Sequence, residues 1–111
     1  MAAPMPAHAK DGDVRVTGTC TASSTSKLKL GLRDGGIEME FQVDQNVNGA
    51  TWNVRVLQNG GQVFKGNRTT KAPSGAFTLK RKLANAAGTD TVRASATNPA
   101  TGETCTATAS I

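Results

Sequence analysis

Hydrophobic and polar residues alternate with a period of two along most of the chain after residue 12. In the segment 37–43, for example, every second residue is apolar and the residues between them are Glu or Gln. Such alternation is typical of a β-strand with one buried face. No stretch shows the 3.6-residue spacing of an amphipathic helix, so the pattern predicts an all-β domain. The alternating segments are 14–20, 28–33, 37–43, 52–57, 62–67, 77–83, 92–96 and 105–111.

Residues suited to tight turns separate several of these segments. Asp34-Gly35-Gly36, Asn59-Gly60-Gly61 and the stretch 98–102 supply the Gly or Asn that a reversal with positive φ requires. The longer stretches 44–50, 66–75 and 84–89 are expected to cross between sheets. This rhythm predicts an immunoglobulin-like two-sheet antiparallel β-sandwich of seven to eight strands, formed by residues 13–111.

Two cysteines lie near the ends of the predicted domain, Cys20 and Cys105. Both fall on the apolar phase of their segments, so both side chains are expected to point inward. Because the first and last strands are neighbours in an immunoglobulin-like order, we expect a disulfide between them. Two free thiols in a cytosolic protein are the alternative.

The N-terminal segment favours the oxidised form. Residues 1–9 read MAAPMPAHA, and Ala7-His8-Ala9 has the A-x-A pattern that precedes a signal-peptidase cut. The apolar stretch of a complete signal peptide is missing, so residues 1–12 are interpreted as a disordered leader that retains a signal-peptide remnant, with a plain leader as the alternative. No segment approaches the length of a membrane span. The protein is therefore expected to be secreted and extracellular.

Part of the chain resembles a known architecture. The segments 37–43 and 51–56, followed by the Asn-Gly-Gly hairpin, resemble strands B, C and C′ of an immunoglobulin or fibronectin type III-like sandwich, with Trp52 as the central tryptophan of strand C. Residues 13–111 as a whole resemble small secreted bacterial domains of this type. The chain departs from the antibody pattern because it has no B–F disulfide and no Tyr. The resemblance is one of architecture and implies no function.

Catalytic and metal-binding patterns are weak. The single histidine, His8, lies in the predicted leader, so no Cys-His or Ser-His pair is expected in the domain. Glu38 and Glu40 fall on an exposed phase and are interpreted as surface residues. Asp11 and Asp13 supply far fewer ligands than calcium takes. We expect no enzyme activity, no metal site and no cofactor.

The net charge of +5 directs attention to the basic residues. On one predicted sheet, the strand that carries Glu38 and Glu40 is expected to lie between two lysine-bearing strands, where opposite charges pair. The lysines of these two neighbouring strands are Lys27, Lys29, Lys80 and Lys82.

The other predicted sheet has no acidic strand. Arg55 and Arg93 are expected to face outward on neighbouring strands, with Lys65 at or near the sheet edge and Arg68 and Lys71 on a nearby loop. These five residues form the candidate binding face, whose partner would be acidic. An ordinary solvated surface is the alternative.

Aromatic residues give little support for stacking ligands. Trp52, Phe41 and Phe77 fall on apolar phases and are expected in the core, whereas the phase of Phe64 is undetermined. This argues against a carbohydrate platform and against single-stranded nucleic acid. The favoured hypothesis is a secreted, non-catalytic interaction module for a protein or an acidic cell-surface polymer. Its alternatives are a secreted inhibitor of an extracellular enzyme, acting through the loop 67–74, and a purely structural extracellular domain; the oligomeric state is left open.

Overall fold

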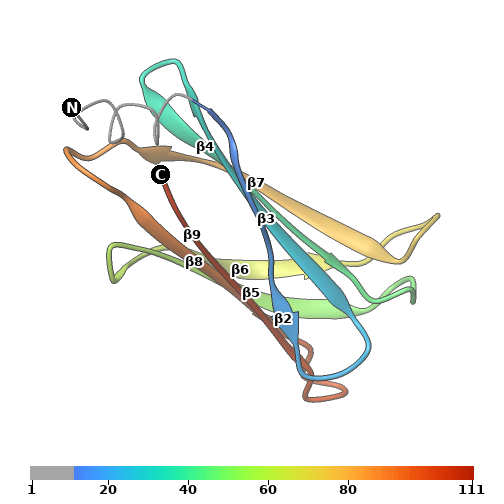
Figure 1. Cartoon of the computed structure of the whole chain (residues 1–111). Helices are drawn as coiled ribbons and strands as arrows, with labels where there is room; N and C mark the ends of the chain where they lie inside the picture. Colours follow the sequence, from blue (N-terminus) through green and yellow to red (C-terminus); the bar gives the residue numbers. More distant parts are fainter. Residues whose placement is uncertain (1–11) are drawn as a thin grey trace.

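The computed structural model describes residues 12–111, so the predicted leader, including His8, lies outside the described residues apart from Gly12. Two antiparallel sheets face each other in these residues (Figure 1), which confirms the predicted all-β sandwich. Sheet A has the strand order β1-β3-β4-β7, and sheet B has the order β2-β9-β8-β5-β6. The strands are β1 (Val14–Thr17), β2 (Thr19–Cys20), β3 (Thr25–Arg33), β4 (Gly36–Asp44), β5 (Thr51–Gln58), β6 (Gly61–Thr69), β7 (Ala76–Ala84), β8 (Thr91–Thr97) and β9 (Thr104–Ser110).

These nine strands exceed the predicted seven to eight because the first predicted strand is divided at Gly18. β1 pairs with β3 in sheet A, whereas β2 pairs with β9 in sheet B. A Cβ atom at Gly18 would lie 2.6 Å from the carbonyl oxygen of Thr106 and would also meet the hydroxyl of Ser26. Glycine therefore fits where the chain passes from one sheet to the other.

The two predicted short hairpins form as expected. Asp34 and Gly35 have φ values of 52° and 78°, and Asn59 and Gly60 have values of 52° and 86°. Positive φ at both central residues is typical of the type I′ turn, whose twist matches that of the paired strands. The connections β4–β5, β6–β7 and β7–β8 cross between the sheets, as predicted.

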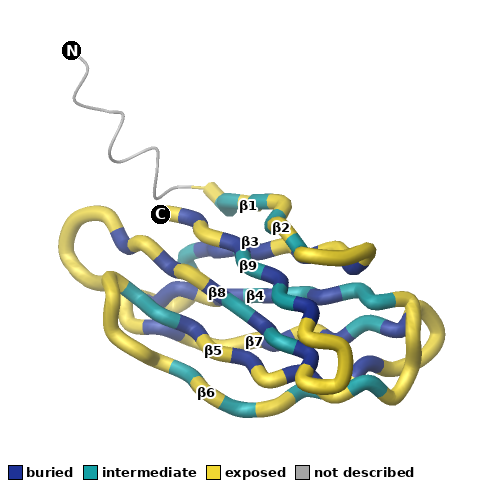
Figure 2. The backbone as a smooth tube through the Cα atoms, turned by 90° about the horizontal axis from the view of Figure 1, so that it is seen from below, coloured by how far each residue is buried: buried dark blue, intermediate teal, exposed yellow. Residues whose placement is uncertain are grey.

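The apolar phases of both sheets meet in one core, seen in Figure 2 as buried positions that recur along β3, β4, β5, β7, β8 and β9. The side chains of Phe41 and Phe77 pack edge to face with ring centroids 6.4 Å apart, and Trp52 lies against Phe77 at the same distance. The Nε1–H of Trp52 donates to Oε1 of Gln45 at 3.0 Å, which satisfies its polar atom. The predicted core aromatics are confirmed.

The predicted disulfide is present. Cys20 and Cys105 are direct partners in the β2–β9 pairing and are bonded to each other across a sequence separation of 85 residues. The prediction that the first and last strands are neighbours is therefore confirmed for β2 and β9. The bond fixes the short strand β2 to sheet B, where two residue pairs alone would hold it weakly.

Candidate binding face

Charges on the outer face of sheet A are paired across strands. β4 lies between β3 and β7, as predicted, and Glu40 stands directly opposite both Lys29 and Lys80. The Nζ of Lys80 is 3.8 Å from Oε2 of Glu40, and the Nζ of Lys82 is 3.4 Å from Oδ2 of Asp34. Exposed pairs of this kind contribute little stability, but they neutralise the face locally.

Asp13, just before β1, joins three cations of the same sheet. Its carboxylate lies 3.2 Å from Arg33, 3.7 Å from Lys29 and 3.7 Å from Arg15. Desolvation tends to raise the pKa of Asp13, but the hydrogen bond from Arg33 and the charges of Arg33, Lys29 and Arg15 outweigh it and lower the pKa overall. Of the two carboxylates that are too few for a calcium site, Asp11 lies outside the described residues and Asp13 pairs with these cations.

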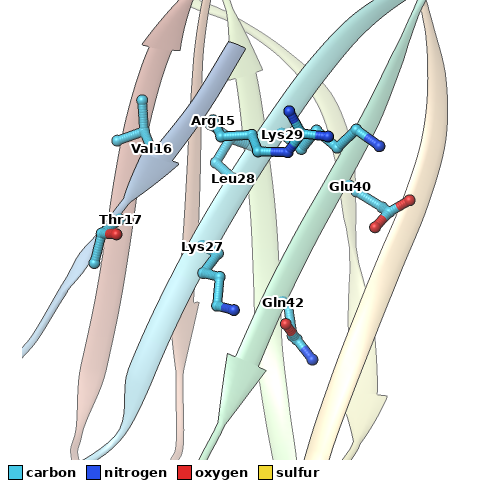
Figure 3. A pocket seen from close by; sticks show the side chains of 8 residues that line it. All are labelled: Arg15, Val16, Thr17, Lys27, Leu28, Lys29, Glu40 and Gln42. Carbon is cyan, nitrogen blue, oxygen red and sulfur yellow. The ribbon is translucent and has the colours of Figure 1, made fainter. Parts of the chain in front are cut away.

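A shallow hollow on sheet A shows this mixture of charges (Figure 3). Its volume is about 480 Å³, and its polar side chains come from β1, β3 and β4. Cations and a carboxylate line it together, so it offers no surface of a single sign. The polar side chains are Arg15, Thr17, Lys27, Lys29, Glu40 and Gln42.

Sheet B presents a different outer face. Arg55 in the middle of β5 has Lys65 of β6 directly opposite on one side and Ser95 of β8 opposite on the other. Arg93 lies two residues before Ser95 on β8, so its side chain points to the same side of the sheet. The exposed residues Arg55, Lys65 and Arg93 are called the basic face below. The Nε–H of Arg55 donates to Oε1 of Gln62 at 3.0 Å, which holds its guanidinium along the sheet.

No carboxylate among residues 12–111 faces outward from sheet B. Its two nearest acidic residues, Asp90 and Glu103, flank strands of this sheet and are buried. Asp90 accepts hydrogen bonds from the side-chain amides of Gln58 and Asn59, and Glu103 accepts from the amide and hydroxyl of Ser24. Both carboxylates accept hydrogen bonds at the ends of the sheet and do not reach its outer face. The positive charge of the basic face is therefore not balanced by a nearby carboxylate.

Two residues of the basic face, Arg55 and Lys65, line a hollow of about 610 Å³ between β5, β6 and β8. Amide, hydroxyl and cationic side chains line it, and no aromatic ring does. Such a lining offers hydrogen-bond donors at close spacing on a flat sheet. The side chains that line the hollow are Asn53, Arg55, Lys65, Asn67, Ser95 and Thr97, together with the backbone near Val54 and Gly66.

Arg68 does not belong to this face, which corrects the prediction that placed it on a loop beside Arg55. β6 extends to Thr69, and Arg68 stands opposite the buried Trp52, so its side chain lies on the inner side of the strand. The run 65–70 is polar and lacks apolar alternation, so its strand character depends on pairing with β5. Phe64, whose phase the sequence left open, is on the same inner side and is half-buried.

Lys71 is also separate from the basic face. It forms an isolated bridge with Ala76 at the start of β7, and with Arg68 it borders another hollow of about 450 Å³ between β6 and β7. The connection expected over 66–75 is therefore much shorter than predicted. Three of the five predicted residues, Arg55, Lys65 and Arg93, therefore share one face. Arg68 and Lys71 lie around the edge of sheet B, apart from that face.

One group of potential metal ligands occurs in residues 12–111. The ligand atoms of Cys20, Glu103 and Cys105 lie within 4.8 Å of one another. Both sulfurs are bonded to each other, however, and the Glu103 carboxylate is already an acceptor for Ser24 and for the amide of Ala22. The arrangement serves to join the β2–β3 connection to β9.

Comparison of the chain with models of protein families, with curated proteins and with solved structures finds no match. Within residues 12–111, no helix has the length and apolar character required to cross a membrane.

Proposed function

We propose that this protein is a secreted, non-catalytic binding module whose basic face engages an acidic cell-surface polymer. The observation that carries the proposal is the contrast in charge between the two faces. Arg55, Lys65 and Arg93 share one exposed sheet surface with no outward carboxylate in the described chain, whereas sheet A pairs its charges. Unbalanced charge on a surface raises the local concentration of an oppositely charged partner.

The composition of the face favours a polymer over a folded protein partner. The centres of protein–protein interfaces are depleted of charge and rich in aromatic side chains. The large hydrophobic residues exposed in residues 12–111 are Val47, in the connection between β4 and β5, and Val63, in β6. Two single exposed residues of this kind do not make an apolar patch. A flat surface of hydroxyl, amide and cationic groups instead suits repeated acidic and polar groups along an extended chain.

The strand order supports the proposed kinship with immunoglobulin and fibronectin type III-like domains. In the lettering of that resemblance, β4, β5 and β6 correspond to strands B, C and C′, and β9-β8-β5-β6 corresponds to the G-F-C-C′ sheet. Trp52 occupies β5, as the resemblance requires. A disulfide is most often found in proteins of oxidising compartments, which supports secretion and the proposed likeness to secreted bacterial domains.

The proposal is tested by titrating the protein with polyglutamate at low salt, with neutral dextran as the uncharged control. Removing two charges in Arg55→Gln/Arg93→Gln is expected to weaken binding about tenfold, because each exposed charge contact contributes roughly 0.5–1 kcal/mol. The matched variant Lys27→Gln/Lys80→Gln removes the same charge from sheet A and is expected to change affinity by less than about twofold. Raised salt is expected to weaken binding of the wild type.

Equal losses in the two double variants would contradict the proposal, because net charge alone would then explain the binding. Absence of polyglutamate binding at low salt would also contradict it. Both variants replace exposed residues, so their folding is readily verified by thermal melting.

A further inference from the structure

The open side of the sandwich between β6 and β7 carries an unusual set of side chains. The guanidinium carbon of Arg68 lies 5.2 Å from the centroid of the Phe64 ring, and that of Arg81 lies 5.0 Å from the same centroid. Phe64 and Arg68 come from the edge strand of sheet B, and Arg81 comes from the edge strand of sheet A. The residues Phe64, Arg68 and Arg81 are called the seam cluster below.

Both arginines occupy positions on the inner phase of their strands. On β7, Arg81 stands directly opposite the buried Met39, and on β6, Arg68 stands opposite the buried Trp52. Inner positions of a sandwich are normally apolar, because they face the core. Here the two guanidiniums converge on one ring instead of turning outward with the neighbouring lysines.

The geometry of β6 allows this convergence. A Cβ atom at Gly66, which lies between Phe64 and Arg68 on the same phase, would be 2.9 Å from Cζ of Phe64. The ring therefore lies over Gly66 along the strand, toward Arg68. A side chain at this position would displace the ring from the seam.

The charge of the seam cluster has no visible counterpart. Neither arginine has an ion pair with a carboxylate among the residues that the structure describes. Nη1 of Arg68 donates to the carbonyl of Asn67 at 2.7 Å. An arginine has five N–H donors, so most of the donors of this pair are available to a ligand. Lys71 borders the adjoining hollow and adds a third cation nearby.

We propose that the seam cluster is an oxyanion site that takes a carboxylate, sulfate or phosphate group. Guanidinium groups bind such oxygens through paired N–H donors, and the Phe64 ring shields one side of the site from water and strengthens the interaction. Two like charges gathered on a ring lose their mutual repulsion when an anion binds. The site lies on the other side of β6 from the basic face, so it does not depend on the function proposed above.

The simpler interpretation is that the arginines only cover an exposed ring by cation–π contact. The two interpretations differ in their response to anions. A purely structural cover responds to added salt through general screening, as every exposed arginine does. At an anion-binding site, the response saturates as the anion is added, and it is confined to the residues of the seam cluster.

The test follows the side-chain Nε–Hε signals of the arginines by NMR while sodium sulfate, sodium phosphate or triglutamate is added at constant ionic strength set with chloride. We expect Arg68 and Arg81 to show saturable shifts with at least one probe, while Arg15 and Arg33 serve as internal references. Strongest binding of triglutamate identifies a carboxylate on a polymer as the source, and strongest binding of sulfate or phosphate identifies a free oxyanion.

Matched variants complete the test. Arg68→Gln/Arg81→Gln is expected to weaken anion binding at least tenfold, whereas Lys80→Gln/Lys82→Gln removes the same charge from the outer side of β7 and is expected to change it less than twofold. Arg81→Lys keeps the charge but loses the paired donors, and is expected to weaken binding about threefold to tenfold in a protein that folds like the wild type. Shifts that are uniform over all arginines or do not saturate, or equal losses in both double variants, would overturn the proposal.

Discussion

The outer faces of the two sheets differ in how their charged side chains are paired. On sheet A, Glu40 stands between two lysines, and Asp13 gathers three cations around one carboxylate. On sheet B, Arg55 and Lys65 are direct cross-strand neighbours of the same sign. Like charges placed opposite each other destabilise a sheet slightly. Sheet B thus retains an arrangement that stability alone does not favour, which is the kind of feature that binding explains.

The sheets also differ in how they hold the N-terminal strands. β1 is attached to sheet A through four residue pairs with β3 and the ion pairs of Asp13. β2 has two residue pairs with β9 and depends on the bond between Cys20 and Cys105. β1 is therefore held by noncovalent contacts alone, whereas β2 is also held by a covalent link.

The largest expected effect therefore comes from removing that link. Cys20→Ser/Cys105→Ser is expected to lower the free energy of unfolding by about 4–5 kcal/mol, because the unfolded chain regains the freedom of a loop of 85 residues. Denaturant unfolding of the variant and the wild type measures this loss. The reductant provides a control, since it should destabilise only the wild type. A loss below about 1 kcal/mol would contradict the view that the bond stabilises the fold by restricting the unfolded chain.

The next largest effect should appear when the charge pairing of sheet A is removed. Glu38→Gln/Glu40→Gln leaves its lysines without their central carboxylates, and we expect polyglutamate affinity to rise about threefold to tenfold as a second basic face forms. Backbone amide shifts of β3 and β7 would then join those of β5 and β6. An unchanged affinity would mean that charge on a sheet face does not determine binding.

The smallest effect concerns Asp13 and pH. Because its cations lower its pKa in the folded protein, its contribution to stability is fully present above the unfolded pKa and is lost as the pH falls through the folded value. Urea unfolding midpoints of the wild type and Asp13→Asn should therefore differ near neutral pH and converge in acid. A difference that persists unchanged at low pH would mean that the side chain acts through packing and not through charge.

Much of this architecture could be predicted from local pattern. The alternation around Phe41 and Trp52 predicts the correct inward faces, and the charge pattern correctly predicts that the strand of Glu38 and Glu40 lies between two lysine-bearing strands. Both follow from the two-residue period of a strand, which fixes the face of every side chain once one is known. The partnership of Cys20 and Cys105 followed from the expected neighbourhood of the terminal strands.

Other features depend on tertiary contacts that alternation does not encode. A strand keeps its period when it changes sheet, so the division at Gly18 was not visible, although a glycine within a strand pattern was a signal for it. The polar neighbours of Arg68 favour a loop in the sequence, and nothing in the basic segment 80–82 distinguishes Arg81 from the lysines beside it. Their convergence on Phe64 results from two edge strands of different sheets meeting in space.

The most direct test of the role of the basic face is to map where polyglutamate binds, by following backbone amide signals of the labelled protein during a titration at low salt. If the basic face binds the polymer, the perturbed amides centre on Arg55, Lys65 and Ser95 of sheet B. Perturbations centred on Lys27 and Gln42 of sheet A would contradict it, because the mixed charges of that face would then be the surface that binds.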